Sequence, residues 1–293
     1  MWVIDPVLII LAAPYSHASL VCAMLGQHPE MYALPDTHLF LADDIEGVLS
    51  AHVKIDNGIG DGLLRLLAQI HDGVQSDDAI QAAKKWLYEH GDWTARQLLD
   101  YVHEKLRPKI LVDSSWSTVV NAENFERMRR TYPDANYLHL VSHPRHAADA
   151  FYENRSSKKS LLKLFDGDLD GELVWYKPND LISEFALSLP EGQCMRLMVE
   201  DLLANPENYL LQIAQWMDLS TNGESISAML YPDKMPFATY GPDSAPGGLE
   251  TEFLEEPTIP VEIGVATLAD SSPHSTCDFS KQALKLGKEY GYR

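Results

Sequence analysis

Cysteine is scarce in this chain. The 293 residues include three cysteines, Cys22, Cys194 and Cys277, and no two of them form a Cys-x-x-Cys pair. An odd number of widely spaced thiols argues against a disulfide framework, and the lack of close ligand spacing argues against a zinc knuckle. Such cysteine usage fits a reducing compartment, so we expect a cytoplasmic protein.

Positive charge is scarce as well. Lys and Arg total 23 against 43 Asp and Glu, which gives a formal net charge of −20. A field of this sign repels nucleic acid and anionic membrane, so we expect neither as a partner. It also disfavours a polyanionic cofactor unless a local cationic pocket overrides it. The simplest interpretation of the acidity is solubility, because the chain is otherwise 45% hydrophobic, as ordinary globular proteins are.

Long hydrophobic runs are missing. The first apolar run, residues 7–13, is too short to cross a bilayer, and Asp5 and Pro6 stand where a signal peptide carries positive charge. We therefore expect residues 7–13 to form a buried strand.

Short apolar runs alternate with amphipathic or polar stretches along the chain. This alternation is typical of βαβ units and a parallel sheet, so we predict a single α/β domain over residues 1–293. The expected strands are 7–13, 109–115, 136–144 and 194–199. The expected helices outside the 60–107 region are 16–27, 38–50, 121–133, 174–188, 200–217 (one or two helices) and 279–289.

Two regions depart from this alternation. Apolar residues at i, i+3 and i+4 near 62–72, 77–90 and 94–106 predict a helical insertion at about 60–107. Residues 231–275 are rich in Pro, Gly, Ser and acid, and we expect them to be irregular and to form a lid or a mobile tail.

Candidate site residues follow the strands, because ligands of open α/β sheets bind at the carboxyl ends of the strands. These ends are residues 13–19, 113–117 and 142–145, with Glu200 and Asp201 after the fourth strand. In "VLIILAAPYSHASL", a strand meets a turn of small residues and then a helix start. Such P-loop-like units offer free backbone N–H groups to an anion.

Five segments together resemble the sulfotransferases that use 3′-phosphoadenosine 5′-phosphosulfate (PAPS), most closely the sulfotransferase domains embedded in polyketide synthases. The donor loop of that family corresponds to "LIILAAPYSHASLVCAMLGQHP" (8–29). Its substrate-side pattern corresponds to "LPDTHLF" (34–40), and its L-V-D-K-T-P segment corresponds to "LVDSSW" (111–116). Its 3′-phosphate segment corresponds to "SHPRHAADA" (142–150), and a later conserved segment to "VEDLLANPENYLLQIAQWMDL" (199–219).

The resemblance implies an α/β fold of the sulfotransferase type, with a parallel sheet flanked by helices. It implies sulfuryl transfer from PAPS to a hydroxyl of a small molecule or a carrier-bound acyl chain, and no metal. His38 would be the general base, with Asp36 holding its tautomer. The positions implied for the donor are Tyr15, Ser16, His17, Ala18, Ser19, Ser114, Ser142 and Arg145.

The chain departs from the family at its cations. Tyr15 stands in place of the loop Arg, Ser114 in place of a Lys and Ser142 in place of an Arg, so Arg145 alone remains. Each charge-assisted phosphate contact contributes roughly 1.5–3 kcal/mol. Three losses would amount to about 5–9 kcal/mol if they were additive. We therefore predict weak or no PAPS binding. His17 is a candidate replacement cation when it is protonated.

Three functions remain open from the sequence. The first is sulfuryl transfer with a degenerate PAPS site. The second is a diverged relative that uses the cleft for a less charged ligand or another reaction. The third is a non-catalytic binding module. For His38, the alternative is a loop histidine satisfied by a backbone carbonyl, and we expect that residue to lie outside the core.

Overall fold

A five-stranded parallel sheet forms the centre of the computed structural model, which describes residues 7–55, 58–165, 168–260, 267–268 and 279–293. Its strands are β1 (Val7–Ala12), β2 (Met31–Ala33), β3 (Ile110–Asp113), β4 (Asn136–Val141) and β5 (Cys194–Met198). They lie in the order β2-β3-β1-β4-β5, and every neighbouring pair is parallel. The α/β class and the parallel sheet are confirmed.

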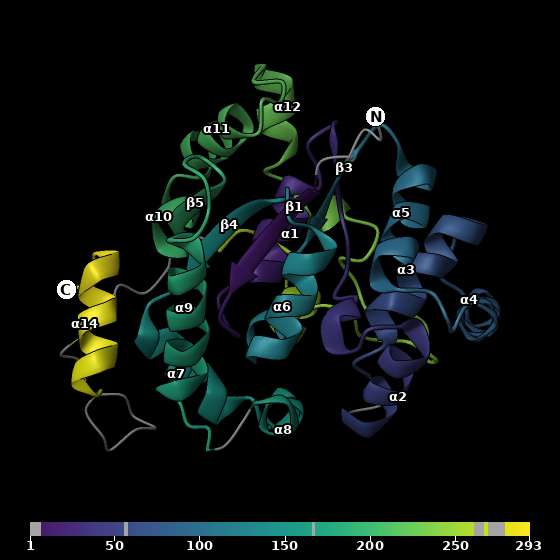
Figure 1. Cartoon of the computed structure of the whole chain (residues 1–293). Helices are drawn as coiled ribbons and strands as arrows, with labels where there is room; N and C mark the ends of the chain where they lie inside the picture. Colours follow the sequence, from purple (N-terminus) through teal and green to yellow (C-terminus); the bar gives the residue numbers. More distant parts are fainter. Residues whose placement is uncertain (1–6, 56–57, 166–167, 261–266, 269–278) are drawn as a thin grey trace.

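Helices cover the sheet and extend beyond its edges (Figure 1). In that view α6 and α9 lie in front of the sheet, α2–α5 form a group on one side of it, and α10 and α11 lie near β5. The longer helices are α1 (Ala18–Leu25), α2 (Ile45–Ile55), α3 (Asp61–Asp72), α4 (Asp77–Glu89), α5 (Ala95–Leu106), α6 (Ala122–Thr131), α7 (Pro144–Glu153), α8 (Arg155–Leu164), α9 (Leu173–Ala186), α11 (Pro206–Trp216) and α14 (Lys281–Tyr290). The shorter ones are α10 (Val199–Ala204), α12 (Gly223–Ala228), α13 (Thr251–Glu255) and the 3₁₀ turns η1 (Leu39–Leu41), η2 (Trp116–Val119) and η3 (Pro232–Lys234).

The strand β2 was not predicted from the sequence. It has three residues and lies at the sheet edge, where it pairs only with β3, so its apolar pattern is too short to identify it. The helix expected at 38–50 is also wrong in its first part. His38 adopts a left-handed conformation and is followed by the η1 turn, so α2 begins only at Ile45.

The predicted helices near 62–72, 77–90 and 94–106 are present as α3, α4 and α5. Side chains fix the starts of two of them: Ser76 accepts a hydrogen bond from Ala79 N, and Thr94 forms a capping box with Gln97. In the 231–275 region, the part up to residue 260 contains only η3 and α13, whereas residues 261–266 and 269–278 lie outside the described part of the chain.

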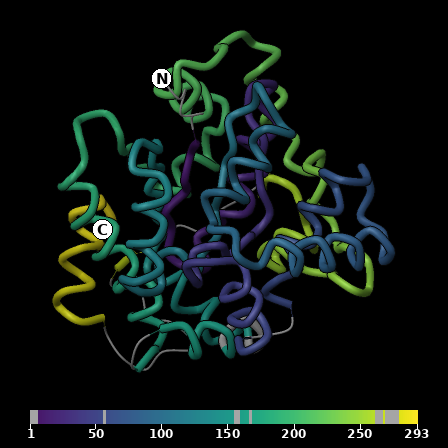
Figure 2. Tube along the Cα trace, turned by 45° about the vertical axis from the view of Figure 1, so that its right-hand side comes forward, coloured from purple at the N-terminus to yellow at the C-terminus, as the bar shows by residue number. Residues whose placement is uncertain are grey.

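The segment 237–250 is tied down by one buried arginine. Arg65 of α3 is 1% exposed, and its guanidinium donates to the carbonyls of Gly247 (2.6 Å), Thr239 (2.7 Å) and Phe237 (3.4 Å). The tube in Figure 2 shows this yellow-green part of the chain beside the blue helices. Because buried carbonyls need partners, these hydrogen bonds help to hold the segment against α3.

We expect Arg65→Leu to lower the free energy of unfolding by more than about 2 kcal/mol, because it leaves buried carbonyls without their charged donor. Arg129→Leu is the matched control: Arg129 is exposed and pairs with Glu126 at the surface, so its loss is expected to change stability by about 0.5 kcal/mol or less. Denaturant titration measures both. Equal effects of the two substitutions would contradict the anchoring role of Arg65.

Candidate functional site

The loop between β1 and α1 has the shape of an anion-binding turn. Tyr15 and His17 have positive φ angles of 65° and 54°, and α1 begins at Ala18. At the far side of the loop, the Ser16 hydroxyl lies 2.9 Å from the Ser142 hydroxyl, which follows β4. The loop and the end of β4 are therefore brought together as the sequence predicted.

The side chain of Glu250, from a distant part of the chain, is hydrogen-bonded to the start of α1, directly after the loop. The Glu250 carboxylate accepts a hydrogen bond from Ser19 N (3.1 Å), and Glu250 N donates to the Ser19 hydroxyl (3.0 Å). Ser19 is in the first turn of α1, where N–H groups have no partner within the helix and attract anions. Burial raises the pKa of Glu250 to about 7, whereas the hydrogen bonds from Ser19 act in the opposite direction. A carboxylate thus takes a position that the resemblance assigned to the donor.

The cations expected near the loop are absent or engaged elsewhere. The Arg145 guanidinium lies 4.2 Å from the centre of the Phe279 ring and donates to the carbonyl of Leu268 (3.3 Å). His17 stacks on His146, with 4.7 Å between the ring centres. Burial, with a smaller contribution from His146, lowers the pKa of His17 to about 4. His17 is therefore neutral at pH 7 and does not replace the lost charge.

Two carboxyl groups, those of Glu250 and Asp113, act on a third, that of Asp36. Asp113 accepts hydrogen bonds from the Ser115 hydroxyl (2.7 Å) and Ser115 N (3.3 Å), and burial raises its pKa to about 6. Asp36 is 5% exposed, and its N–H donates to the carbonyl of Gly248 (2.7 Å). Burial, Glu250 and Asp113 together hold the pKa of Asp36 well above its usual range.

His38 occupies a fixed, buried position. It is 3% exposed, so the expectation that it lies outside the core is wrong. Its Nδ1 lies 2.8 Å from the Ser117 hydroxyl, and its ring meets the Trp116 ring edge-on with 5.1 Å between the centres. The partner of Nδ1 is thus Ser117 and neither Asp36 nor a backbone carbonyl. Burial, with a smaller contribution from His52, lowers the pKa of His38 well below its usual value.

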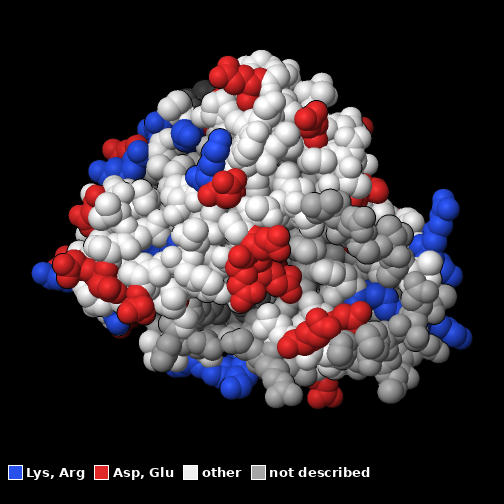
Figure 3. Space-filling model, turned by 180° about the vertical axis from the view of Figure 1, so that it is seen from behind, with Lys and Arg blue, Asp and Glu red and all other residues white. Residues whose placement is uncertain are grey.

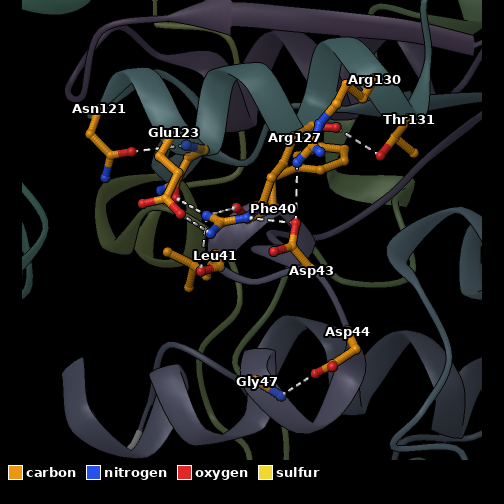
Figure 4. A network of polar contacts seen from close by, with 11 residues as sticks. Phe40, Leu41, Asp43, Asp44, Gly47, Asn121, Glu123, Arg127, Arg130 and Thr131 are labelled. Atoms are coloured by element: carbon orange, nitrogen blue, oxygen red, sulfur yellow. Dashed lines mark hydrogen bonds and ion pairs between the residues drawn. The ribbon is translucent and has the colours of Figure 1, made fainter.

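Arg127 of α6 fixes the η1 turn that follows His38 (Figure 4). Its guanidinium donates to the carbonyls of Phe40 and Leu41 at 3.4 Å each, and to the Asp43 carboxylate at 3.2 Å. Glu123, one turn earlier in α6, also pairs with Arg127. The backbone on the carboxyl side of His38 is therefore held against a sheet-covering helix.

Two cavities meet at Asp36 and Trp116. The smaller, of about 110 Å³, is also lined by Tyr15 and Glu250, and the larger, of about 290 Å³, by His38 and Asp61. A third cavity of about 420 Å³ is lined by His17, Glu250 and Glu252. Among the residues whose side chains the structure describes, which leave out 155–158, no Lys or Arg lines any of the three cavities.

The structure thus unites most of the predicted site residues. The loop positions Tyr15 and His17 line cavities, as do Asp36 and His38, whereas Arg145 packs on another part of the fold. Ser114 is buried at 4% exposure directly after β3. Glu250 was missed by the sequence analysis, because it lies 231 residues from Ser19 in an irregular segment with no motif. In the parts of the chain that are described, no group of three or more His, Cys, Asp or Glu is arranged to hold a metal, and no helix is long and apolar enough to cross a membrane.

Asp36 makes stability depend on pH. Because its pKa is raised in the folded chain, the folded state binds more protons than the unfolded state above the ordinary pKa of Asp. The contribution of Asp36 to stability is therefore fully present at low pH and is lost as the pH rises. We expect Asp36→Asn to raise the Tm over wild type, by more at pH 8 than at pH 5. Scanning calorimetry measures this, with the exposed Asp134→Asn as control; a gain that shrinks toward pH 8 would contradict it.

Comparison with solved structures shows the same fold over the whole chain. The sulfotransferase domain from the curacin biosynthetic pathway matches with a TM-score of 0.78 and 20% identity, covering 99% of each chain. The sulfotransferase domain from the Synechococcus PCC 7002 olefin synthase matches with a TM-score of 0.78 and 20% identity, covering 99% of this chain and 95% of that one.

Comparison of sequences gives the family. No curated protein sequence matches this chain. The family model described as "Sulfotransferase family" matches residues 6–223, which is most of the chain and includes β1 to β5 and the donor-loop, acceptor and 3′-phosphate segments discussed above. The chain therefore belongs to the sulfotransferase family.

Proposed function

We propose that this chain acts on a hydroxyl group of a small molecule or a carrier-bound acyl chain, and that its cleft takes a ligand less negatively charged than PAPS. The observation that carries the proposal is the Glu250 carboxylate on Ser19 N. Because Ser19 N at the start of α1 already donates to a carboxylate of the same chain, we expect this helix start to bind a second anion more weakly.

PAPS does not fit the residues present. The three cavities are lined by acids, and by no Lys or Arg among the side chains that the structure describes, which exclude those of 155–158. Asp36, Asp113 and Glu250 lie at the strand ends, and the Arg145 guanidinium is engaged by Phe279 and Leu268. A polyanion placed here would lie among carboxyl groups, whereas ordinary recognition of polyanions uses cations. We therefore derive no step through that donor.

The acceptor side fits hydroxyl chemistry. A lowered pKa keeps the His38 ring unprotonated at neutral pH, which is the state that a general base requires. When Nδ1–H donates to the Ser117 hydroxyl, Nε2 is the basic nitrogen. His38 also lines the 290 Å³ cavity, so a hydroxyl bound there has a candidate proton acceptor. The similar domains from the curacin pathway and the olefin synthase support an acyl chain as one class of acceptor.

A second candidate is ordinary sulfuryl transfer from PAPS. The preserved loop shape and the contact between Ser16 and Ser142 favour it. It requires the Glu250 side chain to leave the loop, so the two candidates differ in what removal of this carboxylate does.

We expect Glu250→Ala to bind 3′-phosphoadenosine 5′-phosphate (PAP) at least about tenfold more tightly than wild type, because it frees Ser19 N and removes one partly buried carboxylate. Isothermal calorimetry measures both proteins. The matched control is Glu252→Ala, which removes a charge from the same cavities without a hydrogen bond to the loop. Equal gains in both variants would reduce the effect to general electrostatics. Micromolar binding by wild type would overturn the proposal.

We expect His38→Gln to lower hydroxyl-directed transfer by about a hundredfold or more, because it removes the base. The assay follows p-nitrophenolate release from p-nitrophenyl sulfate, a singly charged sulfuryl donor, in the presence and absence of simple primary alcohols. His71→Gln is the control. His71 is on α3, its ring is hydrogen-bonded to the Tyr101 hydroxyl, and it lines none of the three cavities. If wild type shows no alcohol-dependent release, transfer from such a donor is excluded and a binding module remains. If release survives in His38→Gln, His38 is not the base.

A further inference from the structure

We propose that the ligand of this cleft is an amino alcohol, whose ammonium group binds at Asp36 beside Glu250 and whose hydroxyl lies at His38. The inference deepens the proposed function and rests on it, since it uses the same cavity and the same histidine.

The first support is the state of Asp36. Its side chain is one of the most buried carboxyls described, at 5% exposure, and its carboxyl group accepts no hydrogen bond from the described residues. Buried carboxylates are ordinarily paired or bonded to several donors. Asp36 instead lines both adjoining cavities. A ligand that brings N–H donors and a positive charge supplies what this group lacks.

The second support is the rest of the wall. Around the 110 Å³ cavity, Glu250 and Glu252 add negative charge, and Tyr15 and Trp116 add aromatic rings. Aromatic rings attract organic cations, and more strongly when water is excluded. Tyr15 stands at the position that the family resemblance gives to an Arg, so the substitution exchanges a cation for a ring that suits a cation.

The chemistry of the wall favours an organic cation over a metal ion. Within the described ranges, no group of three or more His, Cys, Asp or Glu is arranged for metal binding. An ammonium group needs only hydrogen-bond acceptors and a negative field, and a chain with a net charge of −20 supplies that field. Figure 3 shows acidic side chains gathered near the centre of one face of the molecule, with Lys and Arg mostly toward its edges.

The third support is the arrangement of Asp36 and His38. Both line the 290 Å³ cavity, and they are two residues apart in the sequence. Their Cα atoms are at most about 7 Å apart and both side chains line one cavity, so we take a short ligand chain of about two to four carbons as able to contact both. Among the described residues, the hydrogen bond of the His38 ring is made through Nδ1, so Nε2 is the nitrogen that we assign to the ligand hydroxyl.

The test is isothermal calorimetry at pH 7.5 with three probes of matched length: 3-amino-1-propanol, propylamine and 1,3-propanediol. We expect wild type to bind 3-amino-1-propanol with a dissociation constant in the millimolar range, as suits a ligand this small. We expect propylamine to bind more weakly and the diol to show no binding. Asp36→Asn is expected to weaken amino-alcohol binding at least about tenfold, whereas Asp134→Asn, at an exposed position before β4, leaves it unchanged.

Each result decides the proposal. His38→Gln is expected to reduce the affinity for 3-amino-1-propanol to that for propylamine, because only the hydroxyl contact is lost. Equal binding of the diol and the amino alcohol, no binding of either amine, or unchanged binding in Asp36→Asn would overturn the amino-alcohol assignment. These outcomes leave the proposed function standing if Glu250→Ala still gains PAP affinity over Glu252→Ala. Micromolar PAP binding by wild type would instead remove the proposed function, whatever the amines do.

Discussion

The hydrogen bond between the Glu250 carboxylate and Ser19 N is the contact on which the proposed function depends. The start of a helix attracts anions through its unpaired N–H groups. In this fold the helix concerned is α1, which follows the loop after β1. Here the group that accepts a hydrogen bond at the start of α1 is the Glu250 carboxylate of the same chain. With this carboxylate in place, Asp36 has Glu250 as a negative neighbour, and our proposal that the cleft disfavours a polyanion rests on this arrangement.

The position of Glu250 is imposed by the scaffold around it. Asp36 N donates to Gly248 O, and Asp61 accepts from Gly247 N at 2.8 Å. Gly248 has a φ of 109° and approaches the backbone of α3 so closely that a Cβ there would lie 2.6 Å from Gly62 Cα. Only glycine accommodates both this positive φ angle and this close backbone contact. Two residues after this contact, Glu250 is at the loop, so the insertion helices and the donor loop are linked through one short stretch of chain.

The elements that could be predicted from the sequence are those that a local apolar pattern determines. Four strands, the parallel sheet and the helices of the insertion were found because apolar periodicity extends over several residues in each. The edge strand β2 has three residues, which is too short for an apolar repeat to be recognised. The left-handed conformation of His38 leaves no periodic pattern in the sequence. The loop after β1 was placed at the cleft by the order of the strands, whereas Asp36 and His38 were placed there by the family resemblance. The role of Glu250 was out of reach, because it depends on a contact across 231 residues formed by a segment without regular structure. The burial of His38 likewise comes from packing by Trp116 and Ser117.

The most direct test of this account is a crystal structure of the full chain grown with a large excess of PAP. The account predicts that the Glu250 carboxylate remains on Ser19 N and that no phosphate group lies in the loop between β1 and α1. A structure in which the 5′-phosphate of PAP accepts the hydrogen bond from Ser19 N, with Glu250 turned away from the loop, would contradict it.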